Sequence, residues 1–551
     1  MGGTVEGITN NADVITNCPD DSYAQSRSAI VGWNAPGGFV RNCINNGNIT
    51  LELANHTAQT CYIGTVVGRS QSSADFHAAT ACGLYNLENH GKLTINIKDG
   101  ITVKNFYIGG VSGSANSYTV VESCKNYADV TFNIHNDSGK GAAVCMGGVI
   151  GYSAGEISNC YNEGNVSHLD TGDIKGTIVG GIVGYQNAAL TNSINKGNIT
   201  VTGKKFGGRN SIGSIDGKKS KSTCAPAAAG IVAYCYNATV DGCENYGKIT
   251  FHQTEADGSG KDGKTSVAGI VAAPWGQVSN CKNFGDIDVV RKYSSGNTTD
   301  AACYIGGIAG SDYYPLSQTV SPIVDCVNEG NLTIENDLGT SNSAYGGIVG
   351  WPGIEGDGQT NVTERCINKG NITLNGTAKA RVGGIQGGAG NIVDSHNSGT
   401  IVVNNSHADS PYGGLAGFNT RQTFRITGSS NTGDIIVNLP LTGTASGIGG
   451  LVGARGNTKV PVGNFVGNKV KCTVRAVEAQ HGVGMVVGHY NGNSEMHFGT
   501  AESPIEVGGT LIIGDVTTVV DASNVMDPAV LGGLCPNYTA ASHIYNCVLA
   551  Q

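Results

Sequence analysis

Two short phrases alternate along almost the whole chain, and this repetition limits the possible folds more than any other feature. The first phrase reads Cys-x-Asn-x-Gly-x-Ile, and the second reads Gly-Gly-Ile-Val-Gly, as at residues 180–184 and 346–350. Copies of the first phrase begin 29 to 50 residues apart, so each copy indicates one small structural unit that must stack on its neighbours to bury its apolar side. The copies begin at Cys43, Leu87, Cys124, Cys160, Ser193, Cys243, Cys281, Cys326, Cys366, Ser395 and Ser429.

The residue types in the repeat predict short strands joined by tight turns. Ile-Val and Ile-Thr pairs are β-branched and favour strands, whereas Asn-x-Gly and Gly-Asn tolerate positive φ and favour turns. Glycine supplies 85 of 551 residues while hydrophobic residues keep 39%, a balance that fits neither collagen nor a disordered chain. We therefore predict an all-β fold, an elongated parallel β-solenoid of about twelve coils with about three strands each. Residues 1–27 are predicted to form an N-terminal cap, residues 28–500 the solenoid, and residues 501–551 a C-terminal cap or a linker to a removed region.

Stacking would turn two repeated positions into rows along the solenoid. The Asn of the first phrase is kept in all eleven copies, which predicts an inward ladder of amides that bond from coil to coil. The Cys position would form an inward row of thiols. In-register strands lie about 4.8 Å apart, farther than a disulfide allows between Cβ atoms, so we expect reduced thiols there. The chain has 17 cysteines, and those near the ends, such as Cys18, Cys535 and Cys547, remain candidates for disulfides.

Charge and composition exclude several classes of protein. The net charge of −9 includes no basic stripe, so nucleic acid is not an expected partner. No apolar run approaches the roughly 20 residues of a transmembrane helix. No Cys-x-x-Cys pair or His cluster suggests a metal, and no catalytic residue or cofactor is predicted. The chain also lacks an evident signal peptide at its start.

The Gly-Gly-Ile-Val-Gly phrase, followed by an Asn- and Cys-rich block, resembles the GLUG-type repeats of bacterial surface proteins, with a Bacteroidetes-like appearance. The resemblance covers roughly residues 28–490. It implies secretion and a binding or stalk role without catalysis by the repeats. Some proteins with such repeats carry metallopeptidase domains, but this chain lacks the His-Glu-x-x-His motif of those domains. We accordingly expect an extracellular or outer-surface protein whose signal and anchor are missing from this sequence.

Aromatic residues often follow the second phrase, and they are the candidate ligand-binding residues. Tyr152, Tyr185 and Tyr234 lie in consecutive coils and would form one row, while Trp351 occupies the same position farther along. Tyr313 and Tyr314 lie in an insertion near Trp351. A row of aromatic rings can hold sugars, but it can equally cover the end of a strand. The three functional hypotheses are a non-catalytic adhesin or glycan-binding solenoid, a β-helix polysaccharide lyase or glycoside hydrolase, and a structural stalk. Partners would be glycans or host surface proteins, and an enzyme is the less favoured interpretation.

Overall fold

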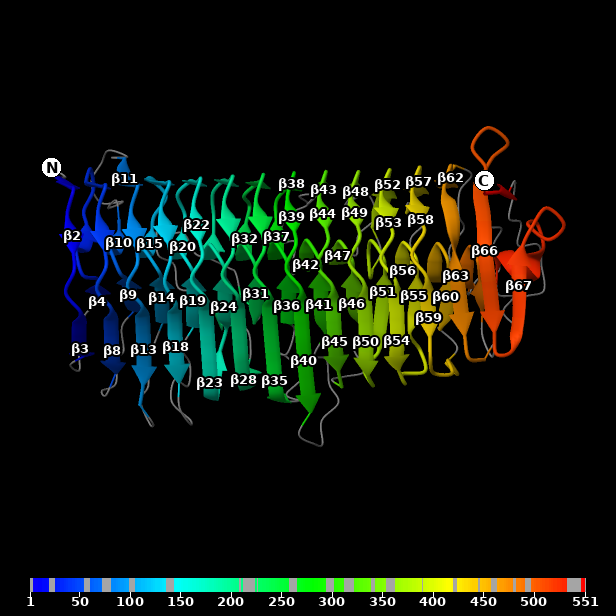
Figure 1. The fold of residues 1–551 in the computed structure, drawn as a ribbon, viewed down its shortest axis with the longest axis horizontal. Helices are drawn as coiled ribbons and strands as arrows, with labels where there is room; N and C mark the ends of the chain where they lie inside the picture. The colour runs from blue at the N-terminus through cyan, green and yellow to red at the C-terminus, as the bar shows by residue number, and fades with distance from the viewer. Residues whose placement is uncertain are drawn as a thin grey trace. The chain divides into compact units, whose positions relative to one another are not determined.

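The structure is a computed structural model in which nearly all regular elements are β-strands (Figure 1). One helical turn, α1 (Pro528–Leu531), interrupts this pattern. Among the described residues no helix is long and apolar enough to span a membrane. The described residues are 3–18, 25–53, 60–71, 81–98, 105–134, 143–207, 210–211, 223–224, 226–256, 265–293, 302–311, 322–337, 342–352, 362–388, 390–419, 424–443, 446–456, 463–478, 482–490, 497–532 and 547–550.

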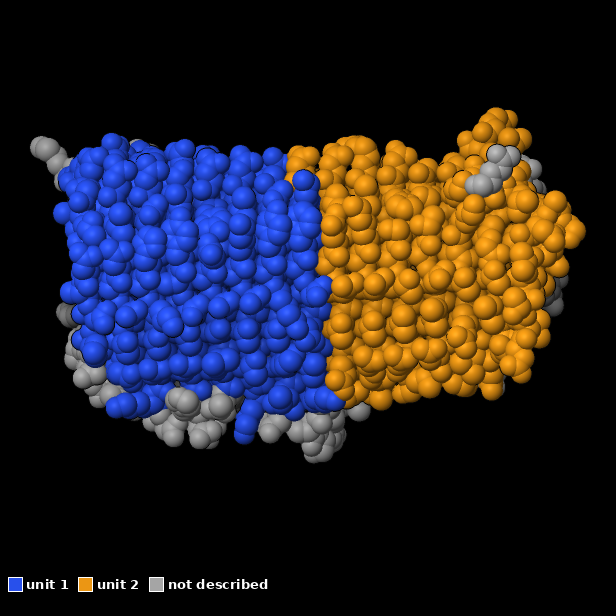
Figure 2. Space-filling model, in the orientation of Figure 1, with its two compact units in different colours: residues 1–276, 281–297 blue, residues 277–280, 298–551 orange. Residues whose placement is uncertain are grey.

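The chain divides into two compact units (Figure 2). Unit 1 contains residues 1–276 and 281–297, and unit 2 contains residues 277–280 and 298–551. Within each unit the strands pair almost entirely in parallel, and each pairs with the equivalent strand of the next repeat. The predicted parallel β-solenoid is therefore confirmed within each unit.

A coil of unit 1 passes through four sheets in turn. The Asn-x-Gly turn divides the run through sheet 2 into two strands, so a coil has five short strands instead of the expected three. Coil 1 comprises β1 to β5, coil 2 β6 to β10, coil 3 β11 to β15, coil 4 β16 to β20, coil 5 β21 to β25, coil 6 β26 to β32 and coil 7 β33 to β37. Sheet 1 contains β1 (Thr4–Glu6), β6 (Phe39–Arg41), β11 (Cys82–Tyr85), β16 (Thr119–Glu122), β21 (Ile157–Ser158), β26 (Leu190–Thr191) and β33 (Val240–Asp241). Sheet 2 contains β2 (Thr9–Asn10), β3 (Val14–Cys18), β7 (Ile44–Asn45), β8 (Ile49–Leu53), β12 (Glu88–Asn89), β13 (Leu93–Ile97), β17 (Lys125–Asn126), β18 (Val130–Ile134), β22 (Tyr161–Asn162), β23 (Val166–Lys175), β27 (Ile194–Asn195), β28 (Ile199–Gly207), β34 (Glu244–Asn245), β35 (Ile249–Ala256), β39 (Lys282–Asn283) and β40 (Ile287–Tyr293).

Sheets 3 and 4 complete each coil, and the Gly-Gly phrase forms the turn between them. Sheet 3 contains β4 (Gln25–Arg27), β9 (Thr60–Gly64), β14 (Asn105–Gly109), β19 (Ala143–Gly147), β24 (Thr177–Gly180), β31 (Ala227–Ala229) and β36 (Thr265–Ala268). Sheet 4 contains β5 (Val31–Asn34), β10 (Val67–Ser70), β15 (Ser112–Ala115), β20 (Ile150–Ser153), β25 (Val183–Gln186), β32 (Val232–Tyr236) and β37 (Val271–Trp275). A short antiparallel pair, β29 (Asn210–Ser211) and β30 (Thr223–Cys224), lies between coils 5 and 6 in sequence.

Unit 2 repeats the same four-sheet plan. Its sheet 1 contains β38 (Val278–Ser279), β43 (Ile323–Val324), β48 (Val362–Glu364), β52 (Asn391–Val393), β57 (Ile426–Thr427) and β62 (Phe465–Val466). Its sheet 2 contains β44 (Val327–Asn328), β45 (Leu332–Asn336), β49 (Ile367–Asn368), β50 (Ile372–Gly376), β53 (His396–Asn397), β54 (Ile401–Asn405), β58 (Ser430–Asn431), β59 (Ile435–Val437) and β63 (Lys469–Ala476). Its sheet 3 contains β41 (Cys303–Gly306), β46 (Ser343–Gly346), β51 (Ala380–Gly383), β55 (Pro411–Gly413), β60 (Gly447–Gly449) and β64 (Val483–Gly484), and its sheet 4 contains β42 (Ala309–Ser311), β47 (Val349–Trp351), β56 (Ala416–Asn419), β61 (Val452–Arg455) and β65 (Val487–Tyr490).

The predicted asparagine ladder is present inside both units. In unit 1 the Nδ2 of Asn126 donates to the Oδ1 of Asn162 at 2.8 Å, and Asn162 donates in turn to Asn195 at 2.8 Å. Each of these amides also donates to the backbone carbonyl two residues ahead in its own turn, as Asn162 does to Gly164. The ladder side chains are fully buried, so these bonds satisfy amides that have no access to water. In unit 2 the ladder joins Asn328, Asn368, Asn397 and Asn431.

The two repeated phrases recur together because residues of one contact residues of the other in the folded protein. The second glycine of the Gly-Gly phrase lies against the ladder asparagine of the following coil. A Cβ on Gly148 would come within 2.4 Å of the Cγ of Asn162, and one on Gly181 within 2.4 Å of the Cγ of Asn195. Any side chain at this glycine would displace the ladder.

The thiol row is also confirmed, and it has a second role. All cysteines whose side chains the structure describes are buried, and none of them forms a disulfide. In several coils the side chain at this position accepts the backbone N–H of the preceding coil. Ser193 Oγ accepts from Cys160 at 3.1 Å, and Cys281 Sγ accepts from Cys243 at 3.4 Å. Cysteine and serine exchange along the row because each provides a small acceptor.

The first coil carries polar side chains at some positions that are apolar in the second coil. Arg27 pairs in register with the buried Ile63 of coil 2, yet its guanidinium donates to Thr16 at 3.0 Å and to Gln25 at 2.9 Å. Polar side chains facing the end of an apolar core are what a cap requires. The capping role of residues 1–27 stays a prediction. At the other end of the chain, β66 (Ile505–Ile513) pairs with β63, with the antiparallel β67 (Val516–Val520) and with β68 (Cys547–Leu549).

Candidate ligand-binding surface

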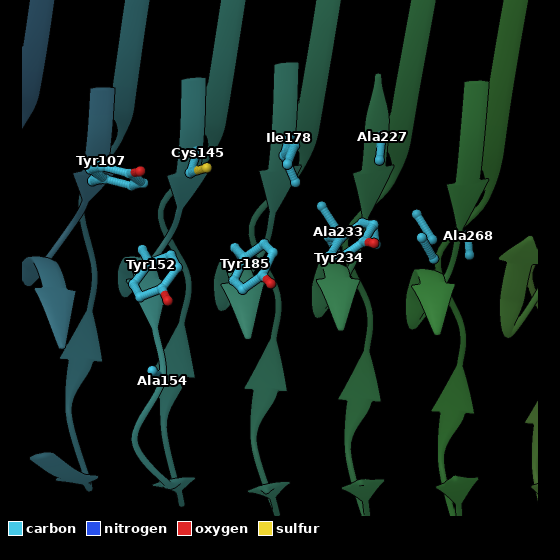
Figure 3. Packing of buried hydrophobic residues seen from close by; sticks show 13 residues of the cluster. Tyr107, Cys145, Tyr152, Ala154, Ile178, Tyr185, Ala227, Ala233, Tyr234 and Ala268 are labelled. Carbon is cyan, nitrogen blue, oxygen red and sulfur yellow. The ribbon is translucent and has the colours of Figure 1, made fainter. Parts of the chain in front are cut away.

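Sheets 3 and 4 of unit 1 carry a continuous stack of tyrosine rings. This corner stack consists of Tyr62, Tyr107, Tyr152, Tyr185 and Tyr234, one from each of coils 2 to 6. Ring centroids lie 5.3 Å apart between Tyr62 and Tyr107, 5.5 Å between Tyr107 and Tyr152, 5.0 Å between Tyr152 and Tyr185, and 5.2 Å between Tyr185 and Tyr234. Figure 3 shows rings from the sheet 4 strands opposite smaller side chains from sheet 3.

The stack follows a rule of one large ring per coil. In coils 4, 5 and 6 the ring comes from sheet 4, and the residue at the facing position of sheet 3 is Cys145, Ile178 or Ala227. In coil 3 the ring is Tyr107 of sheet 3, and the facing position of sheet 4 holds Ser114. A large residue on one sheet thus compensates for a small one on the other, which keeps the corner filled.

The candidate residues Tyr152, Tyr185 and Tyr234 are therefore packed side chains. Their side chains are 7%, 3% and 3% exposed. Neighbouring rings cover the faces that a sugar would need, so the stack supplies buried apolar surface to the coil corner. Ligand binding by these three residues remains a prediction, and the structure gives it no open ring face.

Trp351, the fourth candidate, lies in unit 2 among aromatic and cationic groups. The guanidinium carbon of Arg381 lies 5.2 Å from the Trp351 ring centroid and 4.3 Å from that of Phe418. The Tyr304 ring lies 6.2 Å from Trp351. Trp351 is half-buried and keeps some surface for contact. Tyr313 and Tyr314 lie outside the described residues.

An open row of aromatic side chains occurs instead at the Asn-x-Gly turns of unit 1. This outer aromatic strip consists of His90, Tyr127, Tyr161, Tyr246 and Phe284. His90 stacks on Tyr127 with centroids 4.7 Å apart, Tyr127 lies 5.8 Å from Tyr161, and Tyr246 stacks on Phe284 at 4.6 Å. Lys196 lies between the two groups, with its Nζ 5.6 Å from the Tyr161 ring centroid.

Carboxylates orient two of the three tyrosines of the outer aromatic strip. The hydroxyl of Tyr161 donates to Glu163 at 2.8 Å, and that of Tyr246 donates to Glu244 at 2.7 Å. Burial, together with the hydrogen bond to Glu163, raises the pKa of Tyr161 to about 12, and the bond to Glu244 raises the pKa of Tyr246. Both rings therefore stay neutral and oriented at physiological pH, with Tyr246 44% exposed.

Two polar rows run beside the outer aromatic strip on the same sheet. Three residues after most ladder asparagines lies an outer Asn or Asp. Asn165 accepts the backbone N–H of Asn198 at 3.0 Å, and Asn198 accepts that of Lys248 at 2.9 Å. The second row carries hydroxyls and pairs in register from coil to coil. It contains Thr94, Thr131, Ser167, Thr200 and Thr250, all of them half-exposed.

Two features of the described residues bear on metal binding and on cysteine chemistry. No group of three or more His, Cys, Asp or Glu side chains among the described residues is arranged to hold a metal ion. Burial raises the pKa of the Cys235 thiol to about 12, so this cysteine is not an activated nucleophile.

The comparison with protein families bears directly on the repeat. The model of the GLUG motif family matches residues 142–167, which include the Gly-Gly turn of coil 4 and the Asn turn of coil 5. The chain carries GLUG repeats. No curated protein and no solved structure matches it. In this GLUG-repeat protein the matched segment includes Gly148 and Asn162, the pair whose contact links the two phrases.

The glycine phrase alone does not indicate whether the aromatic row that follows it is exposed or packed. In coils 4, 5 and 6 the residue after this phrase faces the corner between sheets 3 and 4, where neighbouring side chains bury it. The residue directly after the ladder asparagine faces outward, and it is aromatic or histidine in coils 3, 4 and 7. The sequence contains the pattern that could have indicated this row, since His90, Tyr127 and Tyr246 each directly follow a ladder asparagine.

Proposed function

We propose that this GLUG-repeat protein is a non-catalytic binding protein that recognises glycans through the outer aromatic strip of unit 1. The observation that carries the proposal is the open, pre-oriented row of rings with hydroxyl and amide rows beside it. Aromatic rings supply apolar contact area at low entropic cost, and flanking polar groups can hydrogen-bond a sugar. Contiguous exposed aromatic surface on a monomer marks an interaction site more often than scattered residues do.

The ligand class follows from the geometry of the rows. Equivalent residues of successive coils lie about 4.8 Å apart, so all three rows offer the same contact repeatedly along the solenoid. A linear polysaccharide is the ligand that can use a repeated contact of this kind, because several weak sites then act together. A surface-exposed or secreted location, expected from the resemblance, would place such a protein among polysaccharides.

Affinity electrophoresis in gels that contain soluble plant and bacterial polysaccharides tests the proposal. We expect the full chain to be retarded by at least one polysaccharide, and we expect the double variant Tyr127→Ala and Tyr246→Ala to lose the retardation. Tyr118→Ala is the matched control, because Tyr118 is 48% exposed against 44% for Tyr246 but lies outside the strip. Equal retardation of the double variant and the wild type would disprove the role of the strip.

A further inference from the structure

In coil 2 the corner between sheets 3 and 4 holds two large side chains, Tyr62 and Arg69, whereas coils 3 to 6 hold one each. Arg69 occupies the sheet 4 position that pairs in register with Trp33 of coil 1 and with Ser114 of coil 3. The facing sheet 3 position of coil 2 already holds the ring of Tyr62. In the other coils of the corner stack the residue facing the ring is shorter and uncharged, so packing alone does not call for an arginine here.

The guanidinium of Arg69 is held between two rings. Its central carbon lies 4.4 Å from the centroid of Trp33 and 5.4 Å from that of Tyr62. Such cation–π contacts orient the planar group without using its N–H donors. Trp33 itself is 52% exposed, so the ring that supports the cation also presents apolar surface to solvent.

Within the described part of the chain, this cation has no counter-charge. Among the described residues no carboxylate pairs with Arg69 and no side chain or carbonyl accepts from it, and its Nε is buried without a hydrogen-bond partner. A partly buried charge with unused donors is unfavourable until an anion arrives. Arg27 of the first coil also has a buried Nε without a partner, but its terminal nitrogens donate to Thr16 and Gln25.

We propose that Arg69 and Trp33 form a site for a carboxylated sugar, with the guanidinium fork binding the carboxylate and the indole packing on the sugar ring. The guanidinium offers parallel N–H donors that match a carboxylate. A neutral sugar would leave the fork unpaired, and a carboxylate without a ring would leave the indole uncovered. Arg69 and Trp33 are not part of the outer aromatic strip, so this proposal can be tested independently of the proposed function.

The test follows the indole N–H signals of the full chain by NMR, since the protein has three tryptophans and Trp33→Phe assigns the relevant one. Sodium glucuronate, glucose and sodium acetate serve as probes. We expect glucuronate to shift the Trp33 signal with a Kd at least about tenfold below that of either other probe, as expected for a charge-assisted pair. Raising the salt concentration should weaken the binding. Equal affinity for glucuronate and glucose, or for glucuronate and acetate, would overturn the proposal.

Two substitutions at Arg69 complete the test. Arg69→Gln should raise the Kd for glucuronate at least about tenfold, and Arg69→Lys, which keeps the charge but loses the fork, should raise it by a smaller factor. Arg41→Gln is the matched control, because Arg41 lies over the rings of Phe39 and Tyr85 at 4.9 and 5.4 Å on sheet 1. Wild-type affinity in folded Arg69→Gln contradicts the site. If that variant does not fold, wild-type affinity in Arg69→Lys contradicts it. Retardation by polysaccharide that persists in Arg69→Gln separates this site from the strip.

Discussion

At the scale of single residues, the ladder asparagines do what no other side chain can do in their place. Each amide donates within its own turn and to the next coil, and its oxygen accepts from the coil before. Aspartate lacks the donors, and glutamine is a methylene too long for a position against the Gly-Gly turn. This explains why the asparagine is kept while the cysteine position varies.

Replacing one ladder amide should cost far more than replacing an outer one in the same turn. Asn162→Ala leaves acceptors and donors of two neighbouring coils unsatisfied in a fully buried site, so we expect a loss of about 2 to 3 kcal/mol in the free energy of unfolding. Asn165→Ala should cost about 0.5 kcal/mol, because Asn165 is exposed and water replaces its partners. Chemical denaturation measures both, and equal losses would refute the inward ladder.

A second residue-scale prediction concerns the position directly before the cysteine row, which has positive φ in every repeat where it is described. Ser123 there has φ 56°, whereas most coils place Asn, Asp or Gly at this position. Left-handed backbone favours glycine, so Ser123→Gly should stabilise the protein by about 0.5 to 1 kcal/mol. Ser158→Gly, in strand β21 with ordinary φ, should destabilise it by a similar amount. Denaturation midpoints that move in the same direction for both variants would argue against backbone strain at Ser123.

At the scale of elements, strand β23 buries an imidazole where the neighbouring strands bury apolar groups. His168 pairs in register with Phe132 of β18 and Val201 of β28, and its ring lies 5.4 Å from that of Phe132. Burial lowers the pKa of His168 to about 3. The folded state therefore keeps the imidazole neutral, whereas the unfolded chain gains a proton below about pH 6.5.

This difference makes the stability of the protein sensitive to acid. Because the pKa is depressed in the folded state, the contribution of the neutral imidazole is complete above pH 6.5 and is lost as the pH falls toward 3. Between pH 6.5 and 5 we expect a loss of about 2 kcal/mol. His168→Leu should remove this part of the pH dependence. Unfolding curves measured at pH 7 and 5 decide the matter, and identical pH dependence in variant and wild type would show that His168 is not responsible.

The sequence predicts structural features that recur at every repeat. It does not predict the burial of a side chain where that burial depends on how two sheets pack against each other. The ladder, the thiol row and the parallel coils follow from the repeated order and spacing of the two phrases. The burial of Tyr152 and Tyr185 depends on sheet 3 packing against sheet 4 at a corner, and no local pattern reports that packing. The sequence did not predict that each coil contributes two strands to sheet 2. The Asn-x-Gly residues are the same whether the turn interrupts a strand within one sheet or joins strands of two sheets.

At the scale of the whole molecule, the GLUG repeats give a scaffold on which identical backbone positions carry different side chains. The inner positions are constrained by the ladder and the Gly-Gly turn, so variation is left to outer positions such as those of His90 and Tyr246. Binding specificity in a solenoid can therefore change by substitution on one row without disturbing the core. Charged residues also occupy outer positions. Beside the strip, Lys125 pairs with Glu88 at 3.2 Å and Lys282 pairs with Glu244 at 3.6 Å, each across adjacent coils.

We propose that this protein binds glycans and does not cleave them. A glycan array probed with the full chain, followed by a reducing-sugar assay on every glycan that is retained, tests it most directly. We predict that at least one polysaccharide or oligosaccharide series is retained, that the Tyr127→Ala and Tyr246→Ala double variant loses it, and that no new reducing ends form. Release of reducing ends from a retained glycan, or an array without any retained glycan, would contradict the account.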